Sequence, residues 1–142
     1  MLIDKIKLLL GKIKLAALLH KELGVSYFQL LENYLIKRDD TVTIHIKNLS
    51  DNVKIHEALD LANSIRHLRE HGWVITTTIN DIIVFENTQK GIRIYGKMSR
   101  DRPYIFEMAE IFVDEAYKAN FVNKIVIDVG AYLGESAIYF AI

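Results

Sequence analysis

The residues best suited to chemistry lie near the end of the sequence, in the run Ile125–Ile142. A short apolar segment ends at Asp128, and Gly130 and Gly134 follow it closely. This order predicts a buried strand, a tight turn and the start of a helix, the first unit of a nucleotide-type α/β fold. Gly130 can take a positive φ and leaves no side chain in the way of a ligand. The helix start would attract an anionic group, and the Asp128 carboxylate would suit a cationic one.

The spacing of this turn differs from two common phosphate-binding motifs. A dinucleotide fingerprint needs a second glycine where Tyr132 stands, because the main chain must approach the pyrophosphate. A P-loop needs a lysine where Glu135 stands, and a carboxylate there would repel a phosphate. The turn therefore fits neither motif.

The pattern Asp-x-Gly-x-x-x-Gly from Asp128 to Gly134 resembles motif I of class I S-adenosylmethionine-dependent methyltransferases. The longer run VIDVGAYLGESAIYFA is similar to the FkbM family in particular, and EIFVDEAY, residues 110–117, is similar to the helix before motif I in archaeal-type members. The segments TINDIIVF and GIRIYGK stand where such members carry a small β region. The resemblance implies a Rossmann-like domain, S-adenosylmethionine as the cofactor, and methyl transfer to a hydroxyl of a sugar, glycan or small metabolite.

The resemblance also implies cofactor-binding roles for residues of this turn, and it identifies no catalytic base. The residues expected to line the methionine half of the cofactor are Asp128, Gly130, Ala131 and Gly134, with Tyr132, Glu135 and Ser136 as second choices. In that family the ribose and adenine contacts come later, which places them beyond Ile142. We therefore expect an N-terminal fragment that binds S-adenosylmethionine poorly and is inactive by itself.

The composition describes a globular chain and argues against several classes of function. Apolar residues make up 51% of the 142 positions and charged residues 25%, which is typical of folded rather than disordered proteins. The 18 basic and 18 acidic residues cancel, so no excess of positive charge indicates nucleic-acid binding. The absence of cysteine excludes disulfides and thiolate metal sites, and a cytoplasmic protein is the default expectation.

The N-terminal segment, residues 1–24, predicts an amphipathic helix. Charged residues interrupt it, so no run approaches the ~20 apolar residues of a membrane-spanning helix, and it lacks the cleavage pattern of a signal peptide. The favoured interpretation is that its apolar stripe packs on the rest of the protein. A helix lying on a membrane surface is the alternative, since lysines flank the stripe and can meet anionic lipid. The stripe consists of Leu2, Ile6, Leu9, Ile13 and Ala16.

Apolar periodicity and turn residues predict the elements that follow. A helix over 55–71 places its apolar residues on one face and ends at Gly72, which suits a left-handed C-terminal position. Three short strands separated by polar turns predict an antiparallel meander. The expected elements are a helix over 27–36, a strand over 41–46, a turn over 48–52, the helix over 55–71, and strands over 73–78, 82–86 and 92–95.

A polar stretch containing the single proline, Pro103, predicts a domain boundary. Residues 1–103 would form an α+β accessory region, and residues 104–142 the incomplete start of a Rossmann-like domain with a helix over 104–120. The fold class is then α/β. The alternative is a non-enzymatic α+β interaction module whose last strand merely completes its sheet. The expected inner face of the helix over 104–120 is Ile105, Met108, Ala109, Phe112 and Ala116.

Histidines provide the remaining candidates for chemistry. His67 and His71, with Glu70 between them, match the inverted zinc-protease pattern H-x-x-E-H. The pair lies at a predicted helix end, where basic groups also suit the helix dipole, so a solvated helix end is favoured and no metal site is assigned. His20, His45 and His56 are isolated in sequence and are interpreted as ordinary polar residues.

Overall fold

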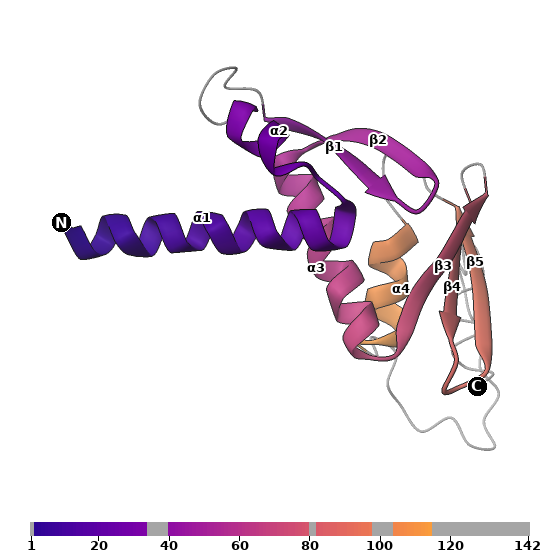
Figure 1. Cartoon of the computed structure of the whole chain (residues 1–142). Coiled ribbons are helices and arrows are strands. Elements are labelled where there is room, and N and C mark those ends of the chain that lie inside the picture. The colour runs from indigo at the N-terminus through magenta and orange to yellow at the C-terminus, as the bar shows by residue number, and fades with distance from the viewer. Residues whose placement is uncertain (1, 34–39, 80–81, 98–103, 115–142) are drawn as a thin grey trace.

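The computed structural model describes residues 2–33, 40–79, 82–97 and 104–114 of the chain. Within these ranges helices and antiparallel sheets are mixed, which is the α+β arrangement predicted for this region (Figure 1). The helices are α1 (Leu2–Leu23), α2 (Tyr27–Glu32), α3 (Ile55–Glu70) and α4 (Tyr104–Phe112). The strands are β1 (Thr41–Ile46), β2 (Leu49–Lys54), β3 (Trp73–Ile79), β4 (Ile82–Asn87) and β5 (Ile92–Lys97).

The strands form two separate antiparallel sheets. β3, β4 and β5 pair in sequence order, which confirms the predicted meander. The second sheet is the hairpin of β1 and β2, in which Ile44 lies opposite Asp51. The alternation predicted for β1 is also confirmed, since Val42, Ile44 and Ile46 are buried on one face.

The predicted turn over residues 48–52 holds only at Asn48 and is wrong for residues 49–52. The chain reverses at Lys47 and Asn48, and β2 begins at Leu49. Local composition favoured a turn because residues 48–52 are mostly polar. Pairing with β1 decides the conformation instead, and the polar side chains Ser50 and Asn52 lie on the exposed face of this short strand.

Helix α3 packs against elements from most of the described chain. It contacts α1, α4, β3 and the hairpin. Its N-terminus is held by the Glu57 carboxylate, which accepts a hydrogen bond from the Lys54 N–H at 3.0 Å. It ends as predicted, with Gly72 at φ +82°. Of the predicted inner face, Ala62 and Leu68 are buried, and Ile55, Leu59 and Ile65 are partly buried against the core.

Helix α4 lies in the same hydrophobic core as α3 and the meander. The predicted inner-face residues Ile105, Met108, Ala109 and Phe112 are all buried. Phe112 contacts Trp73 with ring centroids 5.3 Å apart. The helix is shorter than predicted because it gives way to a turn at residues 113–114, and the rest of the 104–120 prediction lies outside the described residues. The assignment of residues 104–142 to a separate domain stays a prediction.

Helix α1 extends well beyond the elements it contacts (Figure 1). Its last turns are buried at Leu19 and Leu23, and the chain leaves the helix through Gly24 at φ +63°. In its first turns the predicted apolar stripe is exposed, at 49% for Ile6, 59% for Leu9 and 56% for Ile13. The expectation that this stripe packs on the rest of the protein is therefore wrong for the described structure. The helix is longer than the surface that α3 and β1 offer it.

Candidate functional site

The predicted glycine turn, whose residues carry the sequence resemblance, lies outside the described residues. This applies to every predicted cofactor-binding residue: Asp128, Gly130, Ala131, Tyr132, Gly134, Glu135 and Ser136. It applies equally to the strand expected over 124–129. A fragment of a methyltransferase should leave this strand without parallel neighbours, whereas a self-contained module should pair it antiparallel with another strand. Those assignments stay predictions.

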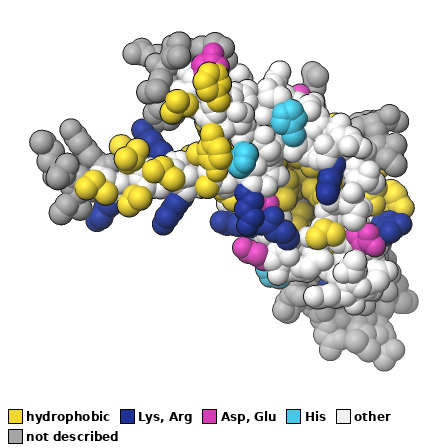
Figure 2. Space-filling view, in the orientation of Figure 1, with side chains coloured by type: hydrophobic (Ala, Val, Ile, Leu, Met, Phe, Trp, Pro, Cys, Tyr) yellow, Lys and Arg dark blue, Asp and Glu magenta, His cyan; other side chains and the backbone are white. Residues whose placement is uncertain are grey.

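The described region contains a cavity of about 380 Å³ where α1, β1, α3 and β3 meet. Figure 2 shows this hollow, with hydrophobic side chains inside it and Lys or Arg side chains at its edge. The apolar part of the lining is Ile46, Ile65, Leu68, Trp73, Val74, Ile75 and Phe85. The polar part is His20, Lys21, Glu22, His45, Lys47 and Arg69, with Gly24 completing the wall.

An ion pair between two helices forms one wall of the cavity. Arg69 of α3 donates from its two terminal nitrogens to the two carboxylate oxygens of Glu22 in α1, at 2.7 and 2.5 Å. The Glu22 side chain is only 1% exposed, whereas that of Arg69 is 40% exposed. The pair is therefore bidentate, with the carboxylate buried and one side of the guanidinium open to solvent.

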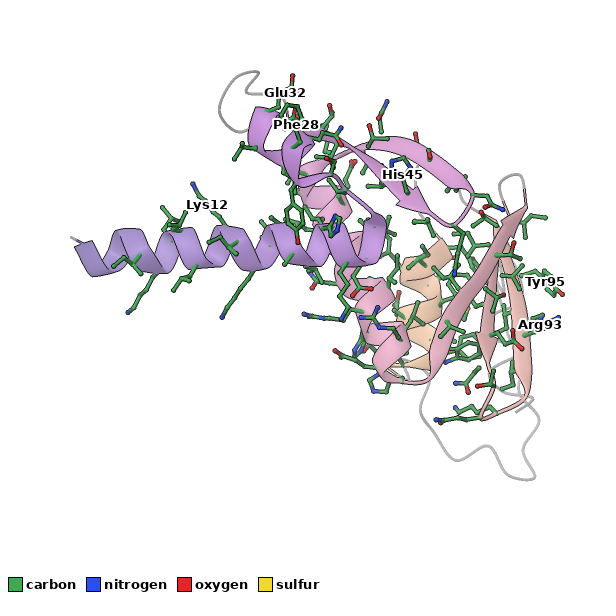
Figure 3. All side chains as sticks on the ribbon, in the orientation of Figure 1. Lys12, Phe28, Glu32, His45, Arg93 and Tyr95 are labelled. Atoms are coloured by element: carbon green, nitrogen blue, oxygen red, sulfur yellow. The ribbon has the colours of Figure 1, made fainter. Side chains whose placement is uncertain are left out.

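Two histidines that are far apart in sequence lie on this cavity. His20 Nδ1 is 3.0 Å from the Val25 carbonyl oxygen, and its ring lies 4.4 Å from that of Tyr27. His45 Nδ1 is 2.7 Å from Ser50 Oγ across the β1–β2 hairpin, and its position is labelled in Figure 3. Each imidazole is thus held through one nitrogen. No local pattern in the sequence predicts that His20 and His45 lie near each other, because only tertiary packing brings α1 to the end of β1.

Lys47 has a strained backbone at the edge of the cavity. Its φ of 56° lies in the left-handed region, and among the described residues it is the sole non-glycine with a positive φ. A left-handed conformation costs an ordinary L-residue roughly 1–2 kcal/mol. The hairpin turn is fixed from outside, since Thr78 Oγ1 in β3 accepts from the Asn48 N–H at 3.0 Å. Strain of this kind often marks a functional position.

Of the H-x-x-E-H residues, His67 and Glu70 line a different, shallow hollow between α3 and the end of α4, and His71 does not. His67 Nε2 is 2.8 Å from an Asp114 oxygen, and His71 Nδ1 is 2.9 Å from the His67 carbonyl oxygen. Glu70 lies 3.9 Å from Arg66 rather than beside the histidines' nitrogens. Across the residues that the structure describes, no three metal-ligating side chains converge. This geometry is that of a solvated helix end.

A polar cluster on β5 faces away from the helices (Figure 3). Hydrogen bonds to Tyr95 and then to Glu86 raise the pKa of the Arg93 guanidinium above its ordinary value. Arg93 and Tyr95 are both exposed and border neither of the two hollows above. We therefore interpret this cluster as linking β4 and β5 on the outer surface of the meander, and we assign no catalytic or binding role to it.

Comparison with known proteins identifies no relative. No family model matches this chain, and neither a curated protein nor a solved structure matches it significantly. Over the described ranges, none of the helices combines the length and apolar character needed to cross a membrane.

Proposed function

We propose that this chain belongs to an S-adenosylmethionine-dependent methyltransferase of the FkbM type, acting in the cytoplasm on a hydroxyl of a sugar, glycan or small metabolite. The single observation that carries the proposal is the sequence from Asp128 to Gly134, in which an acidic residue follows an apolar run and is itself followed by two glycines. The order of elements before it also supports the proposal, because a small antiparallel meander precedes the helix that leads toward this run.

The chemistry would be an in-line displacement at the cofactor's methyl carbon. When bound, the cofactor would supply the methyl group: the acceptor oxygen would bond to that carbon as the carbon–sulfur bond breaks, and a base would take the hydroxyl proton. Asp128 would lie beside the positively charged methionine half of the cofactor, where its carboxylate is complementary in sign. Gly130 and Gly134 would let the main chain approach that group without a side chain between them.

The first prediction concerns Asp128 and is tested on the protein expressed from its complete reading frame. Isothermal titration with S-adenosylmethionine should show binding, and Asp128→Asn should weaken it about tenfold or more, because a hydrogen bond to a charged group is lost. Asp60→Asn removes the same charge from an exposed position of α3 and should leave the affinity unchanged. The proposal fails if the native protein does not bind the cofactor, or if Asp128→Asn and Asp60→Asn bind equally well.

A second candidate function, an interaction module, is favoured by the exposed half of α1. On a helical wheel Ile6, Leu9 and Ile13 share one arc, with Lys12 on one border and Lys7 and Lys14 on the other. Lysines of α1 accompany the hydrophobic side chains on the face shown in Figure 2. Large exposed apolar surfaces of this kind are typical of sites that bind another protein or a membrane.

The charges of α1 favour an anionic lipid surface as that partner. From Lys5 to Leu19 the sequence holds four lysines and no acidic residue. Two copies of the helix would bring like charges together along the shared face, which is unfavourable. Anionic headgroups would instead meet lysines on both borders while the apolar arc enters the acyl boundary. We therefore propose peripheral contact with an anionic membrane as this module's role.

The second prediction is that the chain floats with vesicles of phosphatidylcholine containing phosphatidylserine and does not float with phosphatidylcholine alone. The double variant Leu9→Gln/Ile13→Gln should lose most of this binding, because each buried apolar side chain contributes roughly 1.5–3 kcal/mol. Tyr95→Gln alters an exposed side chain on β5 and serves as the control. Equal flotation of the two variants contradicts the proposal. So does a concentration-dependent dimer without vesicle binding in sedimentation, which would make a second copy the partner.

A further inference from the structure

We propose that the cavity between α1, β1, α3 and β3 binds a small organic anion, a phosphate or carboxylate joined to an apolar group. The lining residues given above include none of the predicted cofactor-binding residues, and the proposal does not depend on the methyltransferase assignment. Its volume of about 380 Å³ suits a small molecule. The inference combines the charges at the rim, the apolar floor and the fixed position of the hairpin turn.

The charge of the rim selects an anion. Three cationic side chains line the cavity, from Lys21, Lys47 and Arg69, against the single carboxylate of Glu22. Glu22 is occupied in its bidentate pair with Arg69. Within the described part of the chain neither Lys21 nor Lys47 has an ion-pair partner. Counting the described lining residues alone, the cavity therefore carries an excess of two positive charges.

The floor of the cavity selects an apolar group attached to that anion. Leu68, Trp73 and Phe85 are almost fully buried, and each contributes to the lining. Ile65 and Ile75, which also line the cavity, are only partly buried, so apolar surface remains accessible from solvent. Apolar walls also strengthen attraction between an anion and the lysines, because they lower the local dielectric constant. A free inorganic ion would leave this surface unused.

The hairpin turn holds Lys47 at the cavity before any ligand arrives. Thr78 Oγ1 accepts from the Asn48 N–H at 3.0 Å and donates to the Ile46 carbonyl oxygen at 3.4 Å. The turn is thus attached to β3 on both sides of Lys47. A lysine stands in a left-handed position where glycine or asparagine would cost less. Lys47 is one of the residues that line the cavity, so the strained position brings a lysine to this site.

The test uses the whole chain and its only tryptophan, Trp73, which lines the cavity. Phenyl phosphate and benzoate are the anionic probes, and phenol and benzylammonium are the neutral and cationic controls of similar shape. We expect a saturable change in Trp73 fluorescence with at least one anionic probe, and much weaker effects of the two controls. Binding of phenyl phosphate alone or benzoate alone decides which anion the site prefers.

The variants separate this site from a general effect of charge. Lys21→Met/Lys47→Met should weaken binding by about tenfold or more, since two charge-assisted contacts are lost. Lys90→Met, in the exposed turn between β4 and β5, changes the net charge of the protein away from the cavity and should have no effect. Unfolding curves verify that each variant is folded. The proposal is overturned if neither anion binds saturably, if phenol or benzylammonium binds as well, or if Lys90→Met weakens binding as much as the double variant.

Discussion

Replacing Gly96 by alanine is expected to destabilise the protein by about 3 kcal/mol, the upper range for overpacking a core. Gly96 is a buried residue of β5, and a Cβ added there would overlap the ring of Tyr104. Tyr104 is itself 2% exposed and lies against Phe85, with ring centroids 5.9 Å apart. The ring therefore cannot move aside without disturbing the contact between α4 and the meander.

Urea unfolding measures this effect, with Gly11→Ala as the matched control. Gly11 lies in α1 with open space around it, so the same change should be neutral or stabilising by up to ~1 kcal/mol. The double variant Gly96→Ala/Tyr104→Ala should be less destabilised than the sum of its two single variants, because removing the ring makes room for the methyl group. Equal stabilities of Gly96→Ala and Gly11→Ala would show that β5 and α4 are not in contact as described.

Replacing Arg69 by methionine is expected to cost about 1–3 kcal/mol, less than for a fully buried ion pair because the guanidinium is 40% exposed. The substitution leaves the Glu22 carboxylate, which is 1% exposed, without its bidentate partner. The cost arises chiefly from that unpaired carboxylate rather than from the loss of attraction. Arg69→Met/Glu22→Met should therefore recover much of the stability, since both polar groups are then gone.

Arg66→Met provides the control for this second experiment. Arg66 lies one turn earlier on α3 and pairs with Glu70 at 3.9 Å, with side chains 49% and 60% exposed. Such a pair contributes only about 0–1 kcal/mol, so its loss should barely change the unfolding curve. If Arg66→Met and Arg69→Met are equally stable, the α1–α3 wall of the cavity is solvated and Glu22 is not buried.

Local patterns in the sequence were sufficient for most elements. The helix ending at Gly72, the strand over 41–46 and the three-stranded meander follow from periodicity and turn residues, which act over a few neighbouring positions. The strand β2 did not follow, because its polar residues become a strand only when β1 supplies hydrogen-bond partners. The composition of residues 49–54 does not show that they pair with β1.

The sequence by itself determined that α1 is an apolar helix flanked by lysines, and it predicts a glycine turn after Asp128. Only the tertiary structure decided which face of α1 is covered, since that depends on how far α3 and β1 extend beside it. It alone brought His20, His45 and Arg69 to one cavity. The reason is physical: periodicity specifies the conformation of each segment, whereas packing between distant segments specifies which side chains meet.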